Sequence, residues 1–164
     1  MRRAGDVLGL AVIDVTSGKK LGQVDDLLFD REGRLHGLSL SRTSWFEKKI
    51  YLPLDHILSI GEDCVTIEGP LPDKLPLPKE EWFRYSRGEQ QMLGRPVITT
   101  NGKQLGILEE VYFDEKQGNI VGYELSDGFM NDVMDGRQLI CQPDQFLFGQ
   151  DAFVVQSPVD PEPM

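Results

Sequence analysis

The residues of this chain that could carry out chemistry are carboxylates, histidines and cysteines. Two acidic pairs, Asp25-Asp26 and Glu109-Glu110, have the composition of a general acid–base pair. Each pair lies in a run predicted as a β-strand, where adjacent side chains point to opposite faces and do not converge on one substrate. The alternation of apolar residues also breaks at both pairs, as it does at a β-bulge. We therefore predict a structural role for both pairs.

The other reactive residues match no catalytic or metal-binding pattern. His56 follows Asp55, but neighbours in sequence do not form a catalytic dyad, and we expect His56 in a surface turn. His36 and His56 have no metal-ligand spacing, and Cys64 and Cys141 form no CxxC pair. The chain also lacks GxSxG, P-loop, HExxH and GxGxxG motifs. The prediction is a protein that is no enzyme, with no catalytic, cofactor-binding or metal-binding residues and with reduced thiols.

The elements that position these residues occur twice. The second copy begins about 85 residues after the first, a period typical of a duplicated domain. The repeated turn glycines are Gly18 and Gly102, Gly22 and Gly106, Gly33 and Gly118, and Gly37 and Gly122. The 164 residues thus divide into two small domains. Since a domain of this size is marginally stable alone, we expect contact between the copies to stabilise both.

Each copy is predicted to be a small barrel of short strands. In the first copy the apolar, β-branched runs cover residues 10–15, 21–29, 34–41, 50–54 and 64–68. Glycine turns separate these runs, and Gly33 suits a hairpin position that needs a positive φ. Short strands at this spacing favour a barrel over a parallel sheet. The predicted fold class is all-β: two tandem small β-barrels joined by a Pro-rich linker.

The predicted domain boundaries follow the repeat and the prolines. They are a first barrel at 1–70, a Pro-rich and aromatic linker at 71–85, a second barrel at 86–157 and a disordered tail at 158–164. Four prolines within residues 70–78 indicate a stiff, extended connector. Trp82, Phe83 and Tyr85 are predicted to pack the linker onto a barrel, and a ligand-binding role for them is the alternative.

The charge of the chain disfavours some partners. The formal net charge is −10, from 27 acidic and 17 basic residues. Such a surface repels phosphate, so we expect no direct nucleic-acid binding and no binding to anionic membranes. No apolar run reaches the length of a membrane span, and the N-terminal residues lack the apolar core of a signal peptide. A cytoplasmic location is the expectation.

An ordered series of motifs in both copies resembles the PRC-barrel domain family. In the first copy these motifs are Leu8-Gly9, Gly18-Lys19, Leu21-Gly22, the acidic pair, Phe29-Asp30, Pro53 to Ile57 and Ile60 to Ile67. The second copy has Leu93 to Val97, Gly102 to Gly106 and Gly149 to Val155, and it is shorter between Pro143 and Gly149. The family includes the cytoplasmic part of the photosynthetic reaction-centre H subunit and the C-terminal domain of RimM-type ribosome maturation factors. The chain most resembles tandem PRC-barrel proteins of bacteria.

The resemblance implies a small barrel used for protein contacts. We therefore expect a non-enzymatic protein-interaction module, an adaptor or scaffold, with a ribosome maturation or RNA-associated factor of RimM type as the alternative. The expected partner is a protein of unspecified identity, and a homodimer is one arrangement that fits.

Two segments that differ between the copies are the predicted docking sites. They are residues 41–49 and 127–137, which lie between the third and fourth predicted strands. Aromatic side chains and methionines on loops suit interfaces. The candidate protein-interaction residues are Trp45, Phe46, Phe129, Met130 and Met134. The alternative is that these side chains plug the ends of their own barrels.

Overall fold

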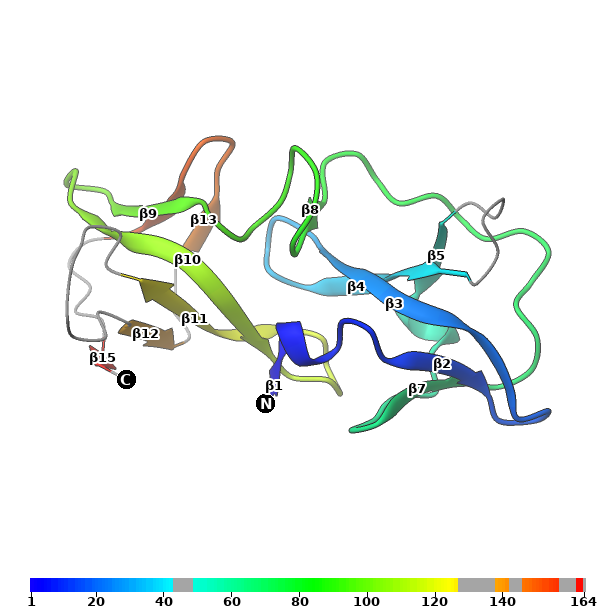
Figure 1. Cartoon of the computed structure of the whole chain (residues 1–164). Helices are drawn as coiled ribbons and strands as arrows, with labels where there is room; N and C mark the ends of the chain where they lie inside the picture. Colours follow the sequence, from blue (N-terminus) through cyan, green and yellow to red (C-terminus); the bar gives the residue numbers. More distant parts are fainter. Residues whose placement is uncertain (43–48, 127–137, 142–145, 157–161, 164) are drawn as a thin grey trace.

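Two curled β-sheets lie side by side in the computed structural model (Figure 1). The structure describes residues 1–42, 49–126, 138–141, 146–156 and 162–163, with the backbone alone at 138–141 and 162–163. The helical elements in these residues are two 3₁₀ turns, η1 (Ala4–Asp6) and η2 (Leu54–His56). No helix in this part of the chain is long and apolar enough to cross a membrane. The prediction of an all-β fold with two barrels is confirmed.

The first sheet consists of strands between residues 11 and 84. Its order is β5 (Ile50–Pro53), β4 (Leu35–Ser41), β3 (Lys19–Phe29), β2 (Ala11–Asp14), β7 (Cys64–Ile67) and β6 (Ser59–Ile60), and β8 (Phe83–Arg84) also pairs with β3. All neighbours are antiparallel except β2 and β7, which are parallel. The five strands predicted for this copy correspond to β2, β3, β4, β5 and β7.

The second sheet repeats this arrangement. Its order is β13 (Phe146–Phe148), β14 (Phe153–Val155), β9 (Pro96–Thr99), β10 (Gln104–Phe113), β11 (Ile120–Ser126), β12 (Gln138–Cys141) and β15 (Glu162–Pro163), and β1 (Arg2–Arg3) also pairs with β10. Strands β14 and β9 are parallel, like β7 and β2. The composition predicts a disordered tail at 158–164. Within it, Glu162 and Pro163 instead form strand β15, which pairs with β12.

The predicted bulges are present at both acidic pairs. The register of β3 against β4 shifts between Val24 and Asp26, and the register of β10 against β11 shifts between Leu108 and Glu110. Each shift adds a residue to a long strand and increases its local twist, which curls the sheet. The parity break in the sequence therefore predicted these irregularities correctly.

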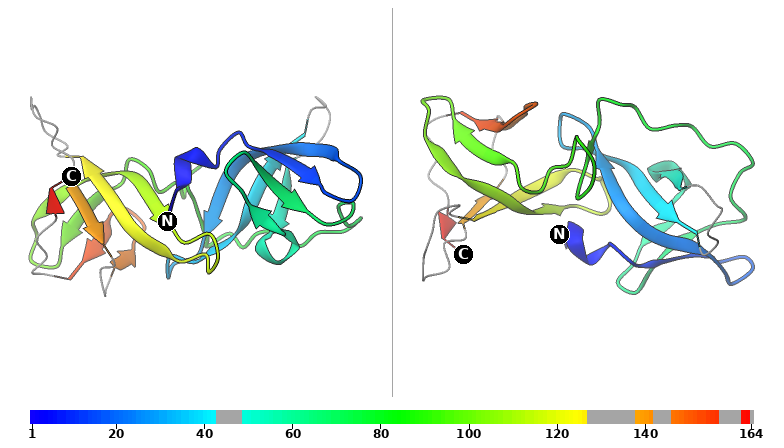
Figure 2. Two further views of the ribbon diagram at one scale, coloured as in Figure 1. Left: turned by 90° about the horizontal axis from the view of Figure 1, so that it is seen from below. Right: turned by 45° about the horizontal axis from the view of Figure 1, so that its top comes forward.

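Each barrel receives a short strand from the segment that precedes the other barrel. The N-terminal strand β1 pairs with β10 in the second sheet, whereas β8, which precedes the second barrel, pairs with β3 in the first sheet. The N-terminus accordingly lies between the two sheets (Figure 2). This reciprocal exchange joins the two barrels through backbone hydrogen bonds.

The β3–β4 and β10–β11 hairpins meet at an approximate twofold axis. Leu35 N donates to Gly118 O at 2.7 Å, and Ile120 N donates to Gly33 O at 2.9 Å. Gly33 and Gly118 occupy the same place in the repeat and have φ values of 78° and 81°, which other residues adopt at a cost. The repeated glycines thus shape two hairpin turns that also form the contact between the copies.

The buried side chains of both barrels form one continuous apolar cluster. Near the axis, Phe29 and its counterpart Phe113 are fully buried and pack edge to face, with ring centroids 6.2 Å apart. Phe83 and Tyr85 are also buried, as predicted for the end of the linker. Burial of apolar surface is the main favourable term in folding, so the junction contributes to the stability of both barrels.

Candidate functional site

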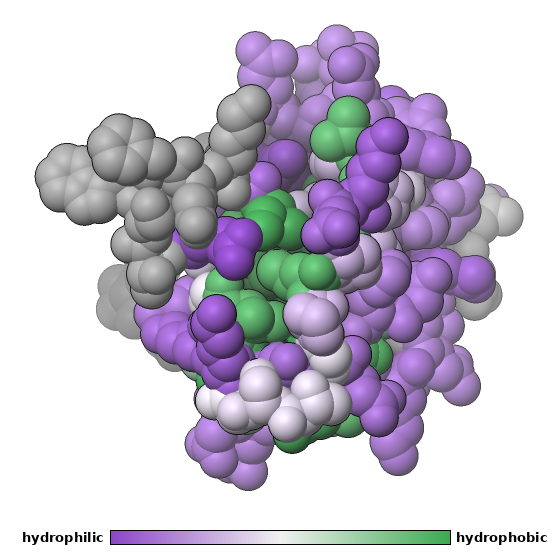
Figure 3. Space-filling model, turned by 90° about the vertical axis from the view of Figure 1, so that its right-hand side faces the viewer, coloured by the Kyte–Doolittle hydropathy of each residue, from purple (hydrophilic) through white to green (hydrophobic). Residues whose placement is uncertain are grey.

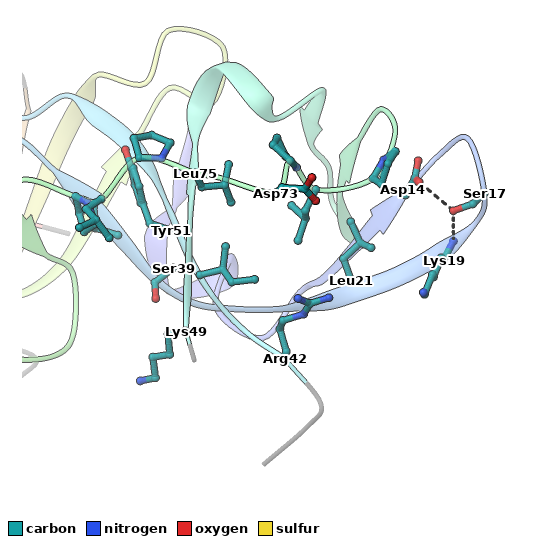
Figure 4. A pocket seen from close by; sticks show the side chains of 18 of the residues that line it. Asp14, Ser17, Lys19, Leu21, Ser39, Arg42, Lys49, Tyr51, Asp73 and Leu75 are labelled. Carbon is teal, nitrogen blue, oxygen red and sulfur yellow. Dashed lines mark hydrogen bonds between the residues drawn. The ribbon is translucent and has the colours of Figure 1, made fainter. Parts of the chain in front are cut away.

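A pocket of about 940 Å³ lies between the first sheet and the Pro-rich segment at 70–78. Its floor includes Leu28 on β3, Ser39 on β4 and Tyr51 on β5. Ser39 pairs with Tyr51, and Leu28 lies two residues along β3 from Asp26, the other partner of Ser39. Neighbouring residues such as Leu27 point into the barrel core, whereas Leu28 is buried outside that core cluster. The linker therefore converts the outer face of this sheet into a partly open pocket (Figure 4).

The start of the linker is fixed by Asp14 at the end of β2. The Asp14 carboxylate accepts hydrogen bonds from Gly69 N at 2.9 Å, from Thr16 N and Oγ1, and from Ser17 Oγ. The hydroxyl of Thr16, assisted by the other donors, lowers the pKa of Asp14 despite the opposing effect of burial. An ionised carboxylate with several donors is a strong anchor for a turn.

The end of the linker is fixed by a cluster of aromatic rings. Trp82 stacks on His36 with ring centroids 4.3 Å apart, and its centroid lies 5.8 Å from that of Tyr51. His36 Nε2 lies 2.7 Å from Asp30 Oδ2, and the Tyr51 hydroxyl donates to the His36 carbonyl at 3.0 Å. Burial, with a smaller effect of Asp55, raises the pKa of Tyr51 to about 12, so this phenol stays a donor at neutral pH.

The lining of the pocket is more apolar than polar. The sheet contributes Leu21, Leu28 and Ile50, and the linker contributes leucines and prolines. The view onto this end of the molecule shows an apolar hollow surrounded by polar residues (Figure 3). Leu77, at the linker side, is 88% exposed, so apolar surface continues from the pocket to the outside.

The rim of the pocket is basic, unlike the chain as a whole. The basic lining residues are Lys19, Arg42, Lys49 and Arg84, and the acidic ones are Asp14 and Asp73. Lys49 Nζ lies 3.0 Å from Asp25 Oδ2, and Arg87 Nη1 lies 3.1 Å from Asp25 Oδ1, so part of this charge is paired. An apolar floor with a basic rim can bind a ligand that combines apolar groups with carboxylates.

Comparisons with known proteins agree with the tandem architecture. The PRC-barrel domain profile matches residues 1–71 and 90–160. The chain belongs to the PRC-barrel family. It is 32% identical over 148 residues to the "Uncharacterized protein YrrD" of Bacillus subtilis (strain 168), a match that covers 90% of this chain and 82% of that protein. The family resemblance inferred from the motifs is confirmed.

The acidic pairs of this PRC-barrel protein hold the exchanged segments in place. Asp26 is fully buried and accepts hydrogen bonds from Leu27 N and from Ser86 N and Oγ. Burial raises the pKa of Asp26, and the hydrogen bonds from Leu27 and Ser86 partly offset this effect. The equivalent residue of the second copy, Glu110, accepts hydrogen bonds from the N-terminal segment.

Glu110 is 3% exposed and has donors from the N-terminal segment and from the segment before the second barrel. Arg3 Nε lies 2.9 Å from Glu110 Oε2, and both Gly5 N and the Tyr85 hydroxyl donate to Oε1. Burial and the bond to Glu110 raise the pKa of Tyr85, which keeps the phenol protonated. The structural role predicted for both acidic pairs therefore matches their contacts.

The remaining candidate residues for chemistry are dispersed. His56 is exposed in η2, in a surface turn as predicted. His36 binds Asp30 and Trp82, as described above, and Cys64 is a half-buried free thiol. In the described part of the chain, no group of three or more His, Cys, Asp or Glu side chains could hold a metal ion.

The five predicted interaction residues, Trp45, Phe46, Phe129, Met130 and Met134, lie outside the described residues. Docking and plugging of the barrel ends both stay predictions for them. The first segment begins and ends beside the pocket, because Arg42 and Lys49 line it.

Sequence reasoning missed the role of the linker in the pocket. The prolines were interpreted as a connector, and the apolar residues between them were left without a role. Leu71, Leu75 and Leu77 alternate with prolines and polar residues, although an exposed connector needs no leucines. That pattern was the available signal for a surface-binding segment.

Proposed function

We propose that this protein is a non-catalytic protein-binding module, an adaptor or scaffold, whose first barrel carries the binding site. The observation that supports this most is the apolar pocket with its basic rim and its exposed leucine, Leu77. Apolar surface that continues outward from a pocket is typical of interaction sites. The buried carboxylates give further support, since hydrogen bonds within the chain occupy Asp26 and Glu110.

A site-specific photo-crosslinker tests this proposal in the bacterial host. The reactive side chain replaces Leu77 beside the pocket or, as a matched control, Leu147 on the second barrel, which is 60% exposed. We expect one defined protein adduct from position 77 and none from position 147. The adduct should form again when the crosslinked protein is purified and mixed with this chain.

Two results would contradict the proposal. Equal adducts from both positions would indicate non-specific contact, and no protein adduct from position 77 would remove the binding site. Crosslinking to RNA from position 77 would instead favour the ribosome-associated alternative.

A further inference from the structure

The two barrels differ at one sheet edge. In the second barrel, β12 pairs on its outer side with β15, with Gln138 opposite Pro163 and Leu139 opposite Glu162. The equivalent strand of the first barrel is β5, because β4 and β11 pair with β5 and β12 in the same register. This register places Ile50 and Tyr51 at the positions of Gln138 and Leu139.

The edge of β5 is open among the described residues. Strand β5 ends its sheet, and no backbone hydrogen bond in this part of the chain joins it to the linker. An open edge presents N–H and C=O groups that can pair with an extended chain. Ile50 and Tyr51 also line the pocket, so the open edge and the apolar floor form one site (Figure 4).

Among the described residues, the second barrel has larger side chains at the corresponding positions of its outer face. Ser39 of the first barrel corresponds to Glu124, and Leu28 corresponds to Tyr112. The Tyr112 hydroxyl donates to Glu124 Oε1 at 3.3 Å. The first barrel has smaller side chains at both positions, and its linker covers the face from above.

The charges around the open edge favour an acidic ligand. Lys19, Arg42 and Arg84 line the pocket, in a chain whose formal net charge is −10. The acidic lining residues are Asp14, which hydrogen bonds within the chain occupy, and Asp73. The basic rim attracts a segment of opposite charge, whereas two whole copies of the chain, each with a net charge of −10, repel each other. The strand that pairs with the equivalent edge of the second barrel contributes an acidic residue, Glu162.

We propose that the open edge of β5 binds an extended acidic segment of a partner protein as an added β-strand. This inference rests on the proposed protein-binding function and names its site and ligand class. Main-chain hydrogen bonds to Tyr51, whose N–H and C=O point away from β4, hold the segment, its apolar side chains contact the floor at Leu28, and its carboxylates face the basic rim. This is the mode in which an added strand gains affinity from the backbone and specificity from alternate side chains.

A synthetic peptide of alternating valine and glutamate residues tests this with the full-length protein. We expect it to bind and to slow amide hydrogen exchange at Tyr51 in β5, whose N–H faces the open edge, but not in β12. The same peptide with N-methylated backbone amides, or with lysine in place of glutamate, should lose binding, by at least about tenfold. Equal binding of either control peptide, or protection elsewhere with β5 unchanged, would overturn the proposal.

Charge reversal at equivalent residues supplies a matched pair of variants. Lys19 lies at the rim, and Lys103 occupies the same place in the second copy; the variants are Lys19→Glu and Lys103→Glu. Lys19→Glu should weaken peptide binding about two- to fivefold, as expected for an exposed charge pair, and Lys103→Glu should leave it unchanged. Equal effects of the two variants would count against the site.

The outcomes separate this inference from the proposed function. A protein adduct at position 77 without peptide protection of β5 would retain protein binding and reject strand addition. Concentration-dependent dimerisation that protects β5 in the absence of peptide would assign the edge to a second copy and also reject the proposal. Loss of both the adduct and the peptide complex would reject the proposed function and the inference together.

Discussion

At the scale of single residues, equivalent carboxylates of the two copies each bind the exchanged segment that precedes the other copy, through different partner residues. Asp26 holds the segment before the second barrel, and Glu110 holds the segment before the first. The sequence predicted that both acidic pairs are structural, because the parity break marked the bulges. It could not identify Ser86 or Gly5 as the partners, since these contacts span 60 and 105 residues.

Removal of the Glu110 side chain should destabilise the folded protein. Glu110→Ala leaves the buried Tyr85 hydroxyl without its acceptor and removes the ion pair with Arg3. We expect the free energy of unfolding to fall by about 2–4 kcal/mol, as for a buried charged partner that is removed. Urea unfolding measures this. An exposed glutamate in a turn is the control, and Glu62→Ala should change stability by less than about 0.5 kcal/mol.

Asp26 should give a pH-dependent stability of unusual sign. Because burial raises its pKa in the folded state, the folded protein holds this proton more tightly than the unfolded chain. The resulting stabilisation is fully present below the ordinary pKa of 3.8 and is lost as the pH rises through the folded-state pKa. Asp26→Asn keeps an acceptor for Leu27 and Ser86 but cannot ionise.

The comparison of Asp26→Asn with the original chain removes the contribution of all other groups. We expect the stability of the variant relative to the original chain to increase from acidic to neutral pH, measured by urea unfolding across that range. A relative stability that decreases over the same range would show that the folded state favours the ionised carboxylate.

At the scale of elements, long strands were predictable and two-residue strands were not. The runs at β3 and β10 carry many alternating apolar residues, and their bulges were visible as a change of parity. Strands β1 and β8 are too short to show a period, and tertiary contacts alone determine their partners. The pocket was missed for a related reason, because a proline-rich composition predicts extension but not the surface on which the segment lies.

The linker should depend on Trp82 for its position. Trp82→Ala removes the stacking on His36 and the contact with Tyr51, so the segment at 70–78 should detach more often. We expect proteolysis within this segment to accelerate about tenfold, with a loss of only about 1 kcal/mol in global stability. Leu77→Ala, at an exposed position of the same linker, is the control. Equal cleavage of both variants would mean that Trp82 does not anchor the linker.

At the scale of the whole molecule, backbone and side-chain contacts connect the two copies of the duplicated barrel. The short strands β1 and β8 are exchanged, the hairpins pair at the approximate twofold axis, and the apolar cluster is continuous. A small barrel buries only about 60% of the surface of its unfolded chain, so we expect these shared contacts to contribute to the stability of both barrels. The exchange also positions the linker, since β8 brings the chain back onto β3 after it has crossed the pocket.

This arrangement predicts that the two halves need each other. If the chain is divided between Asp73 and Lys74, the first fragment contains β1 and the second contains β8, so each lacks a strand that completes its own sheet. Each fragment alone should also expose its half of the junction, including Phe29 or Phe113. We expect little cooperative structure in either fragment alone and a folded one-to-one complex on mixing, measured by circular dichroism and sedimentation. Fragments that unfold cooperatively alone, at the midpoint of the intact chain and without associating, would show that the barrels are independent domains and that the exchanged strands contribute little to stability.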